Sequence, residues 1–281
     1  MTIALRTEGL CKAWGGVYAN DHVTLALPVG ARHALIGPNG AGKTTFVNLL
    51  TGVVTPSAGR VILGDTDVTG LAIHQRVRRG LVRTFQINTL FPGLTVLESV
   101  VLAVCERTGA ASTWRRTVAS CRPQIAEAVE LLERLQLTSA AGTLTRNLPY
   151  GKQRLLEIAL ALAMRPKVLL LDEPASGIPA ADSAEVFGVI AALPSDVAVL
   201  FIEHDMDLVF RFAQRIAVLV DGRLLTEGTP AEIAADQRVR DVYLGEAGGD
   251  PATEDAAEPA AGGVGGDTKG TEGTRGTEGT E

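Results

Sequence analysis

The chain has 281 residues, 46% of them hydrophobic and 21% charged, and a net charge of −6, which is ordinary for a globular protein of one large or two small domains. The chain has 32 acidic and 26 basic residues, of which 8 acidic and 2 basic residues fall in residues 247–281, so the remaining residues hold 24 of each sign. There is thus no basic excess that would favour nucleic-acid binding. No apolar run approaches ~18 residues and none opens the chain, so neither a membrane-spanning helix nor a signal peptide is expected.

Three cysteines, Cys11, Cys105 and Cys121, lie far apart in the sequence. They form no C-x-x-C pair and have no metal-ligand spacing. A sparse, odd set is typical of a reducing compartment, and we expect buried, apolar roles for all three.

The N-terminal part, residues 3–36, predicts short β-strands. Val23, Leu25 and Leu27 alternate with Thr24 and Ala26, which is the period of a half-buried strand. The last apolar run of this part stops where a glycine-rich stretch begins, as a strand that feeds a loop does.

A glycine-rich loop follows that strand and precedes a helix predicted at 44–50, which stops near Gly52. The loop matches G-x-x-x-x-G-K-[ST], in which glycines let successive N–H groups face phosphate oxygens. Lys43 adds a positive charge at the β- and γ-phosphates, the Thr44 hydroxyl is the expected Mg²⁺ ligand, and the helix N-terminus favours the anion. The predicted nucleotide-binding loop comprises Gly37, Pro38, Asn39, Gly40, Ala41, Gly42, Lys43, Thr44 and Thr45.

The middle of the chain, about 92–165, changes to a helical pattern after a hairpin expected over 59–68. A second apolar helix is expected at 152–164, and strands return at 168–171 and 197–202. These patterns therefore predict a mixed α/β core that is interrupted by a helical insert. Four apolar residues of the insert fall on one helix face at amphipathic spacing: Ile125, Val129, Leu132 and Leu135.

The apolar strand predicted at 168–171 ends in two acids, Asp172 and Glu173. A buried strand would deliver Asp172 to Mg²⁺ at the carboxyl end of the sheet, where ligands bind. Glu173 would lie near the γ-phosphate, where a carboxylate can polarise the attacking water. The alternative is a strand that merely ends at a solvated pair of acids, and the phosphate loop upstream favours the hydrolytic interpretation.

The C-terminal part predicts a hairpin and then a helix. Asp221-Gly222 suits a type I′ turn between two apolar runs. Thr229 can cap the helix, Pro230 suits its first turn and Glu232 completes a capping box. From Ala247 onward the composition is mostly Gly, Thr, Glu, Ala and Pro, which cannot offset its ordering entropy, so we predict a disordered tail.

Residues 148–154, L-P-Y-G-K-Q-R, resemble the signature loop of ABC-transporter ATPases, usually L-S-G-G-Q or L-S-Y-G-x-Q-R. The resemblance implies an α/β fold: a P-loop NTPase (RecA-like) core with an N-terminal antiparallel β subdomain and an inserted helical subdomain. We expect this ATPase domain over 3–246, with the insert at about 87–165, and the acidic tail over 247–281. In the family the signature loop of one subunit covers ATP held by the other, which implies contacts in trans from Gly151, Lys152 and Gln153.

The resemblance also implies roles for three isolated residues. Trp14, before two glycines, is similar to the aromatic residue that stacks on adenine; a surface or core tryptophan is the alternative. Gln86 looks like the glutamine that contacts Mg²⁺ and the attacking water. His204 resembles the switch histidine that bonds the γ-phosphate and holds Glu173. The implied cofactors are ATP and Mg²⁺, with catalytic Glu173 and His204, and with the metal ligands Thr44, Gln86 and Asp172.

Two positions depart from the family pattern. Pro149 occupies the place of the signature serine, which donates its hydroxyl to the γ-phosphate, and proline has no such donor. Ile178 stands where the family usually has Asp or Asn, in a loop that links the two nucleotide sites. We therefore predict weakened but not abolished activity at the site that this loop completes, and a pairing with a different ATPase chain that tolerates both changes.

The finer pattern points to one branch of the family. Residues 37–45, 82–86, 202–206 and 242–245, with the Tyr-Gly signature, look like the ATPases of branched-chain amino acid importers, and urea and amide importers share much of this pattern. The implied function is an ATP-binding and ATP-hydrolysing subunit that powers import of a small polar solute, with branched-chain amino acids favoured.

The expected partners follow from that resemblance: transmembrane permease subunits, a second ATPase subunit as a heterodimer or homodimer, and indirectly a periplasmic or extracellular solute-binding protein. The expected location is peripheral, at the cytoplasmic face of the cell membrane. Leu90, Phe91 and Leu94 either form a groove for a permease helix or pack in the core. The rivals are a soluble ABC ATPase acting on nucleic acid or ribosomes, which this single cassette disfavours, and a regulator with negligible hydrolysis.

Overall fold

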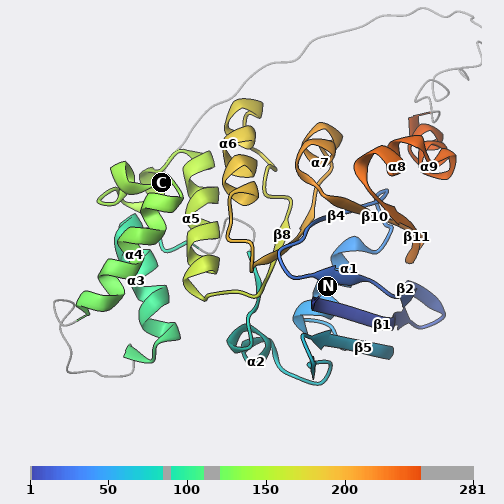
Figure 1. Cartoon of the computed structure of the whole chain (residues 1–281), viewed down its shortest axis with the longest axis horizontal. Coiled ribbons are helices and arrows are strands. Elements are labelled where there is room, and N and C mark those ends of the chain that lie inside the picture. The colour runs from blue at the N-terminus through green and yellow to red at the C-terminus, as the bar shows by residue number, and fades with distance from the viewer. Residues whose placement is uncertain (1, 85–89, 111–120, 248–281) are drawn as a thin grey trace, which may run out of the picture.

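The structure is a computed structural model, which describes residues 2–84, 90–110 and 121–247 (Figure 1). Gln86 and the predicted tail from residue 248 onward lie outside the described residues. None of the described helices is both long enough and apolar enough to cross a membrane.

The N-terminal part forms an antiparallel sheet in the order β2-β1-β5-β6, with β3 also paired to β1. Val23, Leu25 and Leu27 are buried, while Thr24 and Ala26 are exposed, so the predicted alternation is confirmed. The first strand is longer than the short strands expected. The strands are β1 (Ile3–Trp14), β2 (Val17–Val23), β3 (Ala26–Pro28), β5 (Ala58–Leu63) and β6 (Thr66–Asp67).

A second, larger sheet has the order β11-β10-β4-β9-β8-β7, and all neighbours are parallel except β11, which pairs antiparallel to β10. The β10–β11 turn has positive φ at both Asp221 and Gly222, as the predicted type I′ turn requires. The strands are β4 (Arg32–Ile36), β7 (Leu81–Arg83), β8 (Val168–Asp172), β9 (Ala198–Ile202), β10 (Arg215–Val220) and β11 (Arg223–Gly228).

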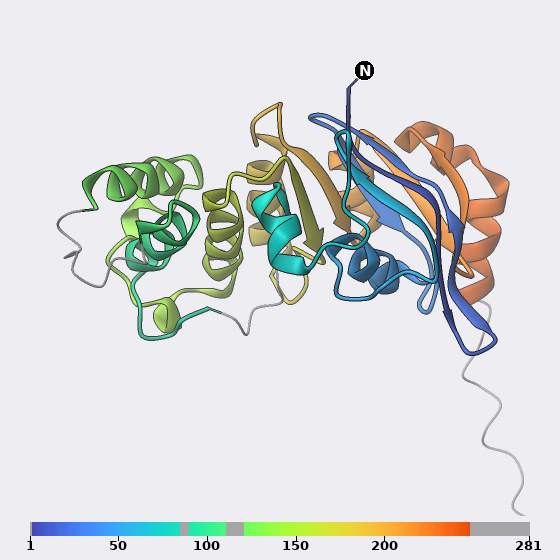
Figure 2. The same cartoon turned by 90° about the horizontal axis from the view of Figure 1, so that it is seen from below.

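Helix α1 (Lys43–Thr51) lies between the two sheets (Figure 2). Its Phe46, Leu49 and Leu50 are fully buried in a core cluster that takes residues from both sheets. The helix ends at Gly52, as predicted, in the left-handed conformation that a Gly cap adopts. This packing fixes the start of α1, and therefore the loop before it, relative to the larger sheet.

The other face of the larger sheet is covered by helices that share a second core cluster with it. Helices α5, α6 and α7 lie next to the sheet, and α3 and α4 pack beyond α5 (Figure 1). Thr229 accepts from the backbone of Glu232 in the predicted capping box at the start of α8. The helices are α2 (Ile73–Arg78), α3 (Val96–Arg107), α4 (Arg122–Arg134), α5 (Tyr150–Ala163), α6 (Ala180–Ala191), α7 (Met206–Phe212), α8 (Pro230–Ala235) and α9 (Gln237–Ala247).

The predicted buried face of α4 is only partly right. Leu132 and Leu135 are buried, but Val129 is 37% exposed and Ala128 is buried in its place. Ala128 thus takes the place of Val129 in the buried stripe, while Ile125, Leu132 and Leu135 stay in it as predicted.

Candidate functional site

The predicted chemistry gathers at one edge of the larger sheet. Strands β4, β9 and β8 are neighbours and run parallel, so their carboxyl ends meet. The phosphate loop follows β4, Glu203 and His204 follow β9, and Asp172 and Glu173 lie at the end of β8. Residues far apart in the sequence are therefore brought together at the edge where α/β sheets bind ligands.

The phosphate loop depends on glycine at two close backbone approaches. A Cβ at Gly37 would lie 2.0 Å from the carbonyl oxygen of Leu219, and one at Gly42 would lie 2.1 Å from that of Ala19. Gly42 has φ 95° and begins α1 with no side-chain cap. The first N–H groups of a helix have no intrahelical partner, so this end of α1 suits an anionic phosphate group.

Lys43 is folded onto its own loop. Its Nζ donates to the carbonyl oxygens of Gly37 at 2.5 Å and of Pro38 at 2.9 Å, and the side chain is buried. Thr44, the next residue, is exposed on the first turn of α1. The lysine charge is thus already at the phosphate loop, where carbonyl oxygens hold it.

Asp172, the expected metal ligand, is held by an arginine that the motifs did not single out. Nη2 of Arg83 lies 2.5 Å from Oδ2 of Asp172, and Nη1 of Arg83 donates to Oδ1 of Asn48 at 2.7 Å. The side chains of Arg83 and Asp172 are both largely buried. Arg83 comes from β7 and Asn48 from α1, so the three side chains tie strands β7 and β8 to the helix after the phosphate loop.

Glu173 and His204, the predicted catalytic pair, are in contact. Nε2 of His204 lies 2.8 Å from Oε1 of Glu173, which fits a histidine that donates to the carboxylate. The backbone of Glu173 has φ 48°, and its N–H donates to the carbonyl oxygen of Ile202 at 3.0 Å. A left-handed backbone is uncommon for a residue other than glycine and often marks a functional site.

Glu203, beside His204, is a second buried acid that sequence reasoning did not identify. Its carboxylate accepts from the N–H of Ala175 at 2.8 Å and from that of His204 at 3.2 Å. Burial raises the pKa of this carboxyl, and the two backbone N–H groups lower it in part. Glu203 thus ties the end of β9 to the segment that follows Glu173. Its only sequence signal is an acid directly after an apolar strand.

The predicted signature residues lie at the start of α5. Pro149 is the N-cap, without a side-chain cap. Lys152 forms an ion pair of 2.7 Å with Glu185 of α6, and Nε2 of Gln153 donates to the carbonyl oxygen of Leu148 at 2.9 Å. A Cβ at Gly151 would lie 3.2 Å from the Cβ of Asp182. Within the described residues, these interactions join the signature residues to α6 and to one another, rather than to the phosphate loop of the same chain.

Trp14 ends β1 and is 57% exposed, so it is available for stacking. The Nζ of Lys12 lies 4.3 Å from the centre of its ring and donates to the carbonyl oxygen of Thr55 at 2.9 Å. A cation over one ring face leaves the opposite face for a flat partner such as a base.

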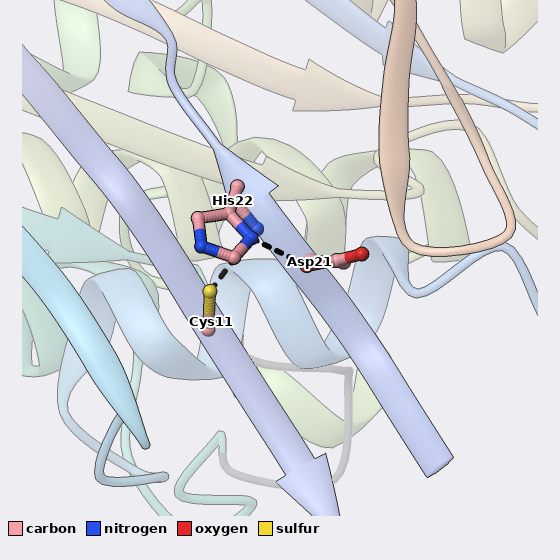
Figure 3. Close-up of side chains that lie close together, drawn as sticks. All are labelled: Cys11, Asp21 and His22. Atoms are coloured by element: carbon pink, nitrogen blue, oxygen red, sulfur yellow. Dashed lines mark hydrogen bonds and ion pairs between the residues drawn. The ribbon is translucent and has the colours of Figure 1, made fainter.

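The hairpin that carries Trp14 is anchored by a cluster of Cys11, Asp21 and His22 (Figure 3). Nδ1 of His22 lies 2.6 Å from Oδ1 of Asp21, and the N–H of His22 donates to Sγ of Cys11 at 3.1 Å. Asp21 also forms an ion pair with Arg223 of β11. These contacts fix β1 and β2 to β11. All three cysteines are buried, as predicted.

Known proteins match this chain over most of its length. Residues 20–176 match the family model of the ABC transporter, and residues 223–249 match that of the branched-chain amino acid ATP-binding cassette transporter. The high-affinity branched-chain amino acid transport ATP-binding protein LivG of Salmonella typhimurium is 41% identical over 250 residues, which are 86% of this chain and 98% of that protein. The corresponding protein BraF of Pseudomonas aeruginosa is 39% identical over 250 residues, again 86% and 98%.

A solved structure supports the fold. The crystal structure of a nucleotide-free ATP-binding cassette from an ABC transporter has a TM-score of 0.75 and 28% sequence identity, and the match covers 86% of this chain and 99% of that one. The α/β architecture expected from the sequence, with its N-terminal antiparallel sheet and inserted helices, is confirmed by this match.

Proposed function

This chain belongs to the family of ABC transporter ATP-binding subunits, which hydrolyse ATP and work with permease components, and from that premise we propose that it powers a branched-chain amino acid importer. The observation that carries the catalytic part is the convergence of the phosphate loop, Asp172, Glu173 and His204 at one sheet edge. Support for the solute comes from the C-terminal match at 223–249 and from LivG and BraF, which are ATP-binding proteins of branched-chain amino acid transport. Urea or amides are the alternative cargo.

The first step of the proposed mechanism is capture of the nucleotide phosphates. The N–H groups at the start of α1 and the charge of Lys43 bind them, while Trp14 offers one ring face to adenine. Lys43 exchanges its bonds to the carbonyl oxygens of Gly37 and Pro38 for bonds to phosphate. Mg²⁺ would be held by Thr44 and Asp172, with Gln86 as a further ligand, and would neutralise charge on the β- and γ-phosphates.

The second step is attack of water on the γ-phosphate. Glu173 polarises the water, and His204 keeps the carboxylate oriented through the 2.8 Å contact. Glu203 accepts hydrogen bonds from the backbone N–H groups of His204 and of Ala175, which follows Glu173. It therefore helps to position both His204 and Glu173.

We propose that the site is completed by a second ATPase subunit. The signature residues Gly151, Lys152 and Gln153 lie at the N-terminus of α5, where they would face ATP bound to the partner. With Pro149 in the serine position, one hydrogen bond to the γ-phosphate is missing. A heterodimer in which the other chain supplies a serine would keep one site strong, and a homodimer would have two weakened sites.

We place the ATPase domain at residues 3–246 and its helical insert at about 87–165. The proposed permease contact is a groove beside this insert. A cavity of about 230 Å³ is lined by Leu90 and by side chains from α1, α2 and α5. Phe91, which follows Leu90 in the chain, is 57% exposed. An apolar hollow with an exposed aromatic residue directly after one of its lining residues suits a docked helix. Docking there would hold the subunit peripherally at the cytoplasmic face of the membrane, near a solute-binding protein that it does not touch.

Affinity co-purification tests this function. The tagged full chain is expressed in its own cells, recovered from detergent-solubilised membranes, and everything that accompanies it is identified by mass spectrometry. We expect multi-span membrane proteins and a second ATPase, and solute-stimulated ATP hydrolysis when the complex is reconstituted with its binding protein and leucine, isoleucine or valine. Recovery of ribosomes or nucleic acid instead would contradict the transporter role, and stimulation by urea alone would replace the cargo.

A further inference from the structure

Glu157 is a buried acid on the wall of the proposed permease groove. It lies on α5, three residues after the end of the signature, and lines the cavity of about 230 Å³. Its side chain is only 4% exposed. The other walls are mostly apolar and include Val53, Ile73, Val77, Leu90, Leu160 and Met164.

One oxygen of this carboxylate lacks a partner. Oε2 of Glu157 accepts from Nη1 of Arg154 at 2.9 Å, but Oε1 is buried and has no hydrogen-bond partner among the residues that the structure describes. Burial raises the pKa of Glu157, and the ion pair with Arg154 lowers it in part. Arg83, the other charged residue on the cavity wall, is engaged by Asn48 and Asp172.

A buried carboxylate oxygen without a donor lowers the stability of the fold, because it has lost its hydrogen bonds to water and has no protein donor in their place. An apolar occupant of the groove would leave that cost in place. An occupant with a cationic donor would instead form a charge-assisted hydrogen bond in a site shielded from water, where such a bond is strong. The acid in this mostly apolar groove therefore selects among occupants by charge.

We propose that Glu157 accepts a hydrogen bond from a lysine or arginine on the permease helix that docks in this groove. The occupant is thus an amphipathic helix with one basic side chain within its apolar face. This inference rests on the proposed function, since it specifies the partner of the same groove.

The position of Glu157 also connects the groove to the reaction centre. Arg154, its ion-pair partner, donates through Nη2 to the backbone carbonyl oxygen of Glu173 at 3.4 Å. A cation that binds Oε1 of Glu157 shares the carboxylate with Arg154, which is bonded to Oε2. Docking of the permease helix would thus change the contacts of Arg154, which donates to the backbone of the catalytic acid Glu173.

Defined peptides test the charge preference without the permease. Three fluorescent helical peptides share the same apolar face and differ at its central residue, which is lysine, norleucine or glutamate. Their binding to the full chain is measured by fluorescence anisotropy at low and high NaCl. We expect the lysine peptide to bind about tenfold or more tightly than the norleucine peptide, and the glutamate peptide to bind most weakly.

The Glu157→Gln variant should bind lysine and norleucine peptides equally. The matched control, Glu130→Gln, changes an exposed acid on α4 and should keep the wild-type preference. Equal binding of the three peptides to the wild-type chain, a preference that survives in Glu157→Gln, or no binding of any peptide would each overturn the proposal. The wild-type comparison stands even if the variant folds poorly. Co-purification of a permease would still support the proposed function after such a failure.

Discussion

Arg83 and Asp172 form an ion pair in which Nη2 of the arginine lies 2.5 Å from Oδ2 of the acid. The carboxylate proposed to bind Mg²⁺ is therefore already neutralised by a cation from the neighbouring strand. Both side chains are largely buried, so removal of one partner leaves a buried charge unpaired. Any metal that binds Asp172 has to share or displace this arginine.

The first prediction concerns that competition. In Arg83→Gln, Asp172 loses its cation, so the metal-free protein should be less stable by about 3 kcal/mol, and added Mg²⁺ should recover part of the loss. The measurement is the free energy of unfolding with and without Mg²⁺. Arg60→Gln, which removes an exposed ion pair with Glu8, is the control and should respond to Mg²⁺ as the wild type does. An equal Mg²⁺ response in Arg83→Gln and the wild type would show that Arg83 does not compete with the metal.

The second prediction concerns the catalytic pair. Glu173→Gln should retain ATP binding but lower the rate of hydrolysis by about 10² or more, because the amide cannot polarise the attacking water. His204→Ala should lower the rate as well, since it removes the 2.8 Å contact that orients the carboxylate. Single-turnover hydrolysis and binding of a fluorescent ATP analogue separate the two steps. Turnover that continues in Glu173→Gln would remove this residue from the catalytic role.

The third prediction concerns the signature proline. Pro149→Ser adds a hydroxyl at the N-cap of α5, which has no side-chain cap. The variant should gain about 1 kcal/mol of stability from capping. In the assembled complex, hydrolysis should also rise, by roughly tenfold for one hydrogen bond to a charged group. Pro149→Ala removes the ring without adding a donor and serves as the control. A serine variant that is stabilised but hydrolyses ATP no faster would confine the residue to a structural role.

The fourth prediction concerns the pH dependence of stability. The pKa of Glu203 is raised in the folded protein from its ordinary value of 4.5, chiefly by burial. A group that holds its proton more tightly when folded makes the free energy of unfolding fall as pH rises from about 4.5 through the raised pKa. Glu203→Gln should flatten this fall, measured by denaturant unfolding across that pH range. Glu130→Gln, an exposed acid, should follow the wild-type curve. Parallel curves for Glu203→Gln and the wild type would refute the assignment.

Local sequence patterns were enough to predict the elements that carry the site. The glycine spacing predicts the loop before α1, and the apolar run before Asp172 predicts β8, because both signals depend only on neighbouring residues. The turn at Asp221-Gly222 and the cap at Thr229 follow from backbone preferences of single residues.

Contacts between distant residues could not be predicted in this way. Arg83 belongs to the motif from which the role of Gln86 was predicted. Its neighbours in the sequence do not indicate that it forms an ion pair with Asp172 on the adjacent strand, β8. The same holds for Glu157, whose burial depends on how α5 packs beside the groove. On α4 the spacing favoured Val129, and only the packing of three helices selects Ala128. The assignments of Gln86, Trp14 and the signature residues to bound nucleotide stay predictions.

The place of β4, β9 and β8 in the larger sheet has a consequence for how the molecule fluctuates. Each of these strands has a hydrogen-bonded neighbour on both sides, whereas β7 and β11 are edges. Their amide hydrogens should exchange with deuterated water only through near-global opening, while edge strands exchange through local fraying. Nucleotide binding to a pair of subunits should therefore slow exchange in the loop before α1 and at the start of α5, and leave the strands that present the acids almost unchanged. We therefore expect Asp172, Glu173 and His204 to lie on the part of the protein that opens most slowly, with the segments that respond to nucleotide around it.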